Sequence, residues 1–254
     1  MKNIAYGIYS SLAAIKQRPF QVKEVYLQES REDKRIQDIQ AELMAKNILY
    51  QYVSKQHLEN LCQETQQQAN HQGVVVVFNE HESMHEVDLL EYCAQAEQAV
   101  LLLVLDQIVD PHNLGACLRT AEAAGANAVI SSTKNSAPMN ATVRKVACGA
   151  AERMPLIFVK NLARYLKELK QLGVWIYGTQ PQANKLIYEA DFSRSSALVV
   201  GAEGSGMRRL IADSCDELLR LPMAGEMASL NASVASGIGL FEVVRQRSKQ
   251  TLAQ

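Results

Sequence analysis

Residues 99–132, AVLLLVLDQIVDPHNLGACLRTAEAAGANAVISS, contain the stretch that decides the fold. An apolar run at 99–106 predicts a buried strand, and small and apolar residues around 114–124 predict a helix. A second strand-like run follows at 127–132. Two strands joined through a helix are typical of a parallel pair, because a parallel connection must cross from one end of the sheet to the other.

The same alternation continues to the end of the chain. It predicts a mainly parallel sheet covered by helices, an α/β fold. The further strand-like runs lie at 155–160, 173–179, 197–202 and 217–223, and the helical stretches at about 140–152, 161–172, 206–215 and 230–247.

Residues 1–78 have a different character and predict a second, small α/β domain. The acidic segment at 79–98 contains neither glycine nor proline and predicts a linker, helical in part near 87–95. The expected organisation is therefore a small domain at 1–78, a linker at 79–98 and a larger domain at 99–254. In the small domain, strand-like runs at 22–28, 48–53 and 73–78 are interleaved with helical patterns at 9–17, 34–47 and 54–65.

Composition bounds the class of protein. No apolar run approaches the roughly 18 residues of a membrane span, and the N-terminus lacks the pattern of a secretory signal, so we expect the cytoplasm. The net charge of −1 divides into +1 for residues 1–78, −6 for 79–98 and +4 for 99–254. Because neither larger segment is strongly basic, binding of RNA would depend on local basic patches. The basic cluster Arg31, Lys34 and Arg35 is either such a patch or a solvated helix face.

Cysteine and histidine patterns indicate no metal site. The five cysteines are scattered and form no C-x-x-C pair, which favours neither a disulfide framework nor zinc. His81 and His85 have a spacing that would let both meet one ion, but no third ligand is evident, so two solvated histidines are the better interpretation.

Ligands of parallel α/β sheets bind outside the carboxyl ends of the strands, and polar loops follow three of the predicted strands. In the first loop, Asn113 stands where a helix cap would stand and Arg119 lies six residues further on. Asn113 could simply cap the helix while Arg119 pairs with Glu122 on its surface. The apolar neighbours of Arg119 instead favour a buried guanidinium that holds an anion.

The second and third loops leave similar alternatives. Gly201, Gly204 and Gly206 match neither common phosphate-binding glycine pattern, so Glu203 is either a capping residue in a tight turn or a carboxylate beside a cleft. In the third loop, Ser229 and Asn231 both stand at the start of a helix. One cap does not require both residues.

Taken together, DPHNLGACLRTAEAAGA, VVGAEGSGMRRL and LPMAGEMASLNASVASG resemble the three motifs of the SpoU (TrmH) family of RNA ribose 2′-O-methyltransferases. YGIYSSLAAI, REDKR and HQGVVV resemble the N-terminal domain of the bacterial members that methylate a guanosine of 23S ribosomal RNA, a domain similar to ribosomal protein L30e. The resemblance extends over the whole chain.

The resemblance implies a trefoil-knotted C-terminal domain of the SPOUT type, S-adenosylmethionine as the cofactor, a homodimer, and ribosomal RNA or a ribosomal precursor as the substrate. No metal is implied. Carried over position by position, the cofactor contacts fall at Thr179, Gly201, Leu221, Met223 and Leu230. The catalytic positions are Asn113, Arg119, Glu203, Ser229 and Asn231.

Chemistry limits what these residues can do in such a reaction. The ribose hydroxyl must lie in line with the methyl group and must lose its proton. A guanidinium is a poor proton acceptor, so we expect Arg119 to hold an RNA phosphate and polarise the hydroxyl, and Glu203 to orient Arg119 or take the proton. Two alternatives stay open: a tRNA ribose methyltransferase, against which the extra N-terminal domain argues, and a non-catalytic RNA-binding assembly factor.

Overall fold

The structure is a computed structural model that describes residues 3–17, 19, 22–29, 31, 33–63, 70–78, 85–227 and 229–251. The chain forms two compact units. The N-terminal unit comprises residues 1–82 together with 138–153, and the C-terminal unit comprises 83–137 together with 154–254.

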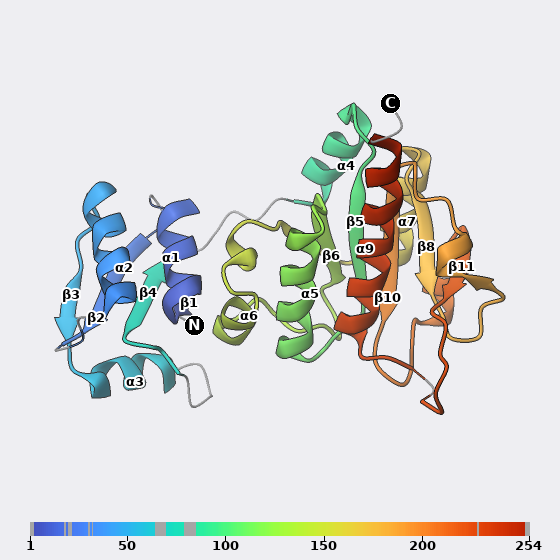
Figure 1. Cartoon of the computed structure of the whole chain (residues 1–254). Helices are drawn as coiled ribbons and strands as arrows, with labels where there is room; N and C mark the ends of the chain where they lie inside the picture. Colours follow the sequence, from blue (N-terminus) through green and yellow to red (C-terminus); the bar gives the residue numbers. More distant parts are fainter. Residues whose placement is uncertain are drawn as a thin grey trace. The chain divides into compact units, whose positions relative to one another are not determined.

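A seven-stranded sheet forms the centre of the C-terminal unit (Figure 1). Its strands lie in the order β7-β6-β5-β10-β8-β11-β9, and each ladder between the described residues is parallel. The mainly parallel α/β sheet predicted from the sequence is therefore confirmed. Its strands are β5 (Leu101–Asp106), β6 (Ala128–Ser132), β7 (Leu156–Val159), β8 (Trp175–Thr179), β9 (Lys185–Leu186), β10 (Ser196–Gly201) and β11 (Glu217–Arg220).

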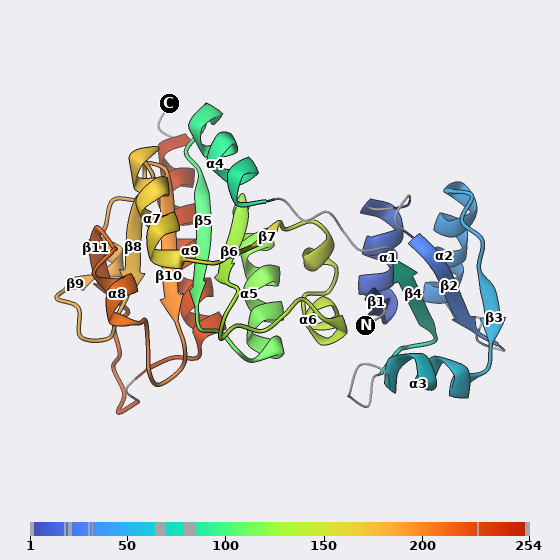
Figure 2. The ribbon, with the colours of Figure 1, turned by 180° about the vertical axis from the view of Figure 1, so that it is seen from behind.

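Helices cover both faces of this sheet, as its continuous apolar strands require. Helices α5 (Pro111–Ala123) and α9 (Ala232–Thr251) lie side by side on one face (Figure 1). The opposite face carries α4 (Glu86–Gln95), α7 (Leu162–Gln171) and the short α8 (Arg209–Ala212) (Figure 2). No helix of the described segments is long and apolar enough to cross a membrane.

Helix α4 falls within the segment that the sequence predicted as a linker. Its Leu89 and Cys93 are buried in the core that also contains residues of α7 and the sheet. The Tyr165 hydroxyl donates to the Glu86 carbonyl at 2.8 Å, and the Lys160 amide donates to the Glu86 carboxylate at 3.1 Å. The helical part of 79–98 therefore belongs to the C-terminal unit, whereas residues 79–84, with His81, lie outside the described segments.

A four-stranded sheet, in the order β1-β4-β2-β3, forms the centre of the N-terminal unit. Its middle strand β4 alternates between two cores, as a strand covered on both sides must. Val74 and Val76 face the core under α1 and α2, and Val75 and Val77 face the core that contains Leu58 of α3. The elements are β1 (Asn3–Tyr6), β2 (Val22–Gln28), β3 (Gln51–Val53), β4 (Val74–Phe78), α1 (Ile8–Gln17), α2 (Lys34–Ala45) and α3 (Lys55–Gln63).

Residues 138–153 depart from the predicted organisation, which placed them in the second domain. Their helix α6 (Ala141–Val146) packs against β1, and the Ser10 hydroxyl donates to the Arg144 carbonyl at 2.9 Å. Arg144 and Glu152 form an ion pair whose side chains are 5% and 1% exposed. These long-range contacts could not be read from local sequence, which indicated only a helix near 140–152.

Candidate active site

Asn113, Glu203 and Asn231 meet through their side chains in the C-terminal unit. The Asn113 amide Nδ2 donates to Glu203 Oε1 at 2.8 Å, and Asn231 Nδ2 donates to Asn113 Oδ1 at 2.9 Å. Asn231 Nδ2 also donates to Glu203 Oε1. Three loops that are far apart in the sequence thus deliver one connected polar cluster, which we call the amide–carboxylate cluster.

Asn113 is not the helix cap. Helix α5 begins at Pro111, and the preceding Asp110 caps it by accepting a hydrogen bond from the His112 amide at 2.9 Å. Proline suits this first position because its missing N–H would have no partner within the helix. Asn113 therefore lies in the first turn, and its side chain is available to Glu203.

Asn231 has two roles at once. Its Oδ1 accepts from the Ser233 amide at 2.9 Å, from the Ser233 hydroxyl at 2.6 Å and from the Val234 amide at 3.4 Å. These bonds cap the start of α9. Because the other end of the same amide donates into the cluster, helix capping fixes the direction in which Nδ2 points.

Glu203 lies in a tight loop that follows β10. A Cβ atom added to Gly201 would stand 2.2 Å from backbone atoms of Gly206 and Met207, so the loop can fold back only over a glycine. Gly204 and Gly206 adopt φ values of 76° and 68°, the left-handed region that glycine tolerates. The capping alternative for Glu203 is wrong, since Arg208 occupies the cap position of α8.

A cavity of about 540 Å³ lies beside the cluster. Its size falls within the usual range for small-ligand sites, and its lining combines apolar residues with polar and charged ones and with the glycines of the Glu203 loop. This mixture suits a ligand with both apolar and charged parts, such as S-adenosylmethionine. The lining includes Glu203, Ser229 and each of the five positions expected to contact the cofactor, Thr179, Gly201, Leu221, Met223 and Leu230.

Arg119 is exposed, so the expectation that it is buried is wrong. The buried face of α5 is made by residues that include Leu114, Cys117, Leu118 and Ala121. Residues three or four apart share one side of a helix, and Arg119 lies one, two or five residues from each of these positions. Its side chain therefore projects outside the buried face. An apolar neighbourhood along the sequence therefore did not imply burial of the intervening arginine.

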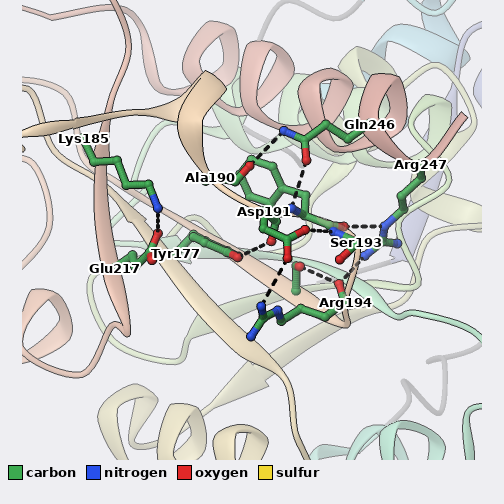
Figure 3. Close-up of polar contacts among 11 residues, drawn as sticks. Tyr177, Lys185, Ala190, Asp191, Ser193, Arg194, Glu217, Gln246 and Arg247 are labelled. Atoms are coloured by element: carbon green, nitrogen blue, oxygen red, sulfur yellow. Dashed lines mark hydrogen bonds and ion pairs between the residues drawn. The ribbon is translucent and has the colours of Figure 1, made fainter. Parts of the chain in front are cut away.

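The C-terminal end of α9 is anchored to the segment before β10 (Figure 3). Gln246 accepts from the Phe192 amide at 3.0 Å and donates to the Ala190 carbonyl at 3.0 Å. Arg247 donates to the carbonyls of Phe192 and Arg194, at 3.1 and 2.9 Å. Burial lowers the pKa of the Arg247 guanidinium. These bonds fix the far end of the helix that Asn231 caps.

Comparison with known proteins gives two family matches. Residues 100–241 match the SpoU rRNA Methylase family. Residues 4–84 match a second family, described as RNA 2′-O ribose methyltransferase substrate binding. The chain is 46% identical over 247 residues to 23S rRNA (guanosine-2′-O-)-methyltransferase RlmB of Pectobacterium atrosepticum, covering 97% of this chain and 99% of that protein.

Two solved structures share the fold. An AdoMet-bound rRNA methyltransferase from Sinorhizobium meliloti is 25% identical with a TM-score of 0.76, covering 96% of this chain and 87% of that one. The SpoU methyltransferase AviRb from Streptomyces viridochromogenes, in complex with AdoMet, is 20% identical with a TM-score of 0.80, covering 98% and 91%.

Proposed function

Because the chain belongs to the SpoU rRNA methylase family, we propose that it transfers a methyl group from S-adenosylmethionine to the ribose 2′-oxygen of a guanosine in 23S ribosomal RNA. One observation carries this proposal beyond the family match. The amide–carboxylate cluster borders the cavity lined by the five expected cofactor positions, so a polar group for the hydroxyl and a pocket for the methyl donor lie together.

The arrangement of Glu203 supports a role in handling the hydroxyl proton. Both amide donors bind Oε1, and Oε2 accepts no hydrogen bond from the described residues. Oε2 is therefore available to accept the hydrogen bond of a ribose hydroxyl and to take up its proton as the oxygen–carbon bond forms. Asn113 and Asn231 hold the carboxylate in one orientation, which lowers the cost of ordering it during reaction.

The cofactor and the remaining catalytic positions complete the proposal. S-adenosylmethionine, when bound, supplies an electrophilic methyl group on a sulfonium. Thr179, Gly201, Leu221, Met223 and Leu230 would hold it. Arg119, whose side chain reaches the surface, would bind an RNA phosphate, and Ser229 would help to place the ribose beside the cavity.

The proposal extends to RNA binding, assembly and location. Residues 4–84 would bind the RNA substrate, with the exposed Lys34 and Arg35 contacting phosphates. We expect a homodimer with a trefoil-knotted C-terminal domain in the cytoplasm. On α9, Val234 and Phe241 are each 48% exposed, which leaves apolar surface for a second copy. Light scattering of the wild type and of Phe241→Asp tests the dimer.

Transfer of labelled methyl from S-adenosylmethionine to purified 23S ribosomal RNA, followed by mapping of the modified nucleotide, tests the function. We expect one labelled guanosine, and loss of the label in Asn231→Ala and Arg119→Ala. The variant Arg164→Gln, which breaks an exposed ion pair on α7, serves as the matched control. Label confined to transfer RNA would favour the tRNA alternative, and failure to bind S-adenosylmethionine by calorimetry would favour a non-catalytic assembly factor.

A further inference from the structure

A fully buried carboxylate at the end of β5, Asp106, forms an ion pair with half-exposed Arg208 in the loop after β10. The Asp106 side chain is 0% exposed. It accepts from the Arg208 backbone amide at 2.8 Å, from Arg208 Nε at 2.9 Å and from Arg208 Nη2 at 2.6 Å. Three bonds from one partner, 102 residues away in the sequence, make this a specific attachment.

The attachment closes the Glu203 loop at its base. In the ladder between β10 and β5, Gly201 pairs directly with Asp106. The loop therefore leaves the sheet beside Asp106 and returns to Asp106 at Arg208. Within the loop, the Gly206 amide donates to the Ala202 carbonyl at 2.8 Å. Both ends of the segment that carries Glu203 are thus fixed to a single residue.

Asp106 is also connected to the other side of the cluster. The chain turns at Gln107, which has a positive φ of 63°, and enters α5, whose first turn carries Asn113. Asp106 is therefore joined to Asn113 through the six residues 107–112 of the chain, and to the Glu203 loop through the bonds from Arg208. The 2.8 Å bond between Asn113 and Glu203 spans these two segments.

We infer that Asp106 and Arg208 are positioning residues for methyl transfer, which hold Glu203 at the distance that Asn113 requires. The inference rests on the proposed function for its catalytic readout. An ion pair that contributes only stability would behave differently. Removing one partner leaves an uncompensated buried charge, whereas removing both can be nearly neutral for stability.

The double variant Asp106→Asn/Arg208→Gln separates these two roles. Arg208→Gln alone strands the buried Asp106 carboxylate, and we expect it to lower the melting temperature. The double variant carries no stranded charge, so we expect its melting temperature to recover most of that loss. Its loop has nevertheless lost the guanidinium bonds, so we expect kcat at saturating RNA and S-adenosylmethionine to stay about tenfold or more below the wild type. Arg208→Lys keeps the positive charge, so we expect its kcat to lie between those of Arg208→Gln and the wild type.

Hydrogen exchange of the peptide that covers 202–208 provides a readout that needs no activity. In the double variant we expect this peptide to exchange about tenfold faster, while peptides from α7 stay unchanged. Arg164→Gln should match the wild type in kcat, melting temperature and exchange.

The inference is overturned if the kcat of the double variant lies within threefold of the wild-type value, or if exchange at 202–208 does not change. If Arg208→Gln does not fold, Arg208→Lys and the double variant decide by the same criteria. An inactive wild type together with faster loop exchange in the double variant would contradict the proposed function and not the attachment.

Discussion

Substitution of Asn231 should separate helix stability from catalysis, because its two amide ends have different partners. Its Oδ1 caps α9, and its Nδ2 donates to the Glu203 carboxylate and to Asn113. Asn231→Asp keeps the capping oxygen and removes the donor. Asn231→Ala removes both. We therefore expect the aspartate variant to retain stability and both variants to lose activity.

The magnitudes follow from the bonds that each variant loses. Loss of an Asn cap costs about 1 kcal/mol of folding free energy, and aspartate caps about as well as asparagine. A hydrogen bond to a charged group contributes about 1.5–3 kcal/mol. When the lost bond stabilises only the transition state, the same free energy corresponds to a decrease in kcat of roughly 10- to 150-fold. In Asn231→Asp, repulsion between two carboxylates adds to the loss of activity.

Asn161 provides the matched control, because it caps α7 by accepting from the Arg164 amide at 3.1 Å and lies outside the cluster. Asn161→Ala should cost about the same 1 kcal/mol and leave kcat unchanged. Denaturant unfolding measures the stability of each variant, and methyl transfer at saturating substrates measures kcat. Wild-type kcat in Asn231→Asp, or equal kcat in the two alanine variants, would refute the reasoning.

Three further predictions concern the cavity, the helix anchor and the thiols. Gly201→Ala should abolish S-adenosylmethionine binding in calorimetry, because the new Cβ would stand 2.2 Å from the backbone of Gly206 and Met207; retained affinity would contradict the tight loop. Arg247→Ala should lower the free energy of unfolding by about 3 kcal/mol, since it removes charged donors from several carbonyls, and denaturant unfolding checks this value. Burial raises the pKa of the Cys117 thiol to about 11 and of the Cys215 thiol to about 12. Because the reactive thiolate is rare below the pKa, both thiols should resist iodoacetamide at pH 8 in the native protein and react after unfolding, as peptide mass spectrometry would show.

The strands of the C-terminal unit could be predicted because they are continuous apolar runs, and α7 because its buried residues recur at the helical spacing. Each strand-like run predicted between 99 and 223 forms a strand, whereas two-residue β9 was missed because it is too short to give a pattern. Strand β1 was missed as well, since four residues at 3–6 carry no more signal than a loop.

The candidate site could be predicted only as separate pieces. Polar residues in loops after strands marked Asn113, Glu203 and Asn231, but the same residues also suited helix caps. The structure assigns the cap of α5 to Asp110 and gives Asn231 both roles. Asp106 was visible as an acidic residue that ends an apolar strand, but nothing near it in the sequence indicated Arg208 as its partner.

The sequence by itself determined the parallel α/β architecture, the family motifs and the residue types available at three loops, because strand burial, helix period and glycine positions are local properties. Only the tertiary structure decided that Asn113, Glu203 and Asn231 share hydrogen bonds, that Arg119 is exposed, and that the buried Asp106 carboxylate pairs with Arg208. These facts depend on strand order, which brings β5 beside β10 although 89 residues separate Asp106 from Ser196 in the chain. Side-chain distances across such a separation follow from the packing of the whole sheet and not from any local pattern.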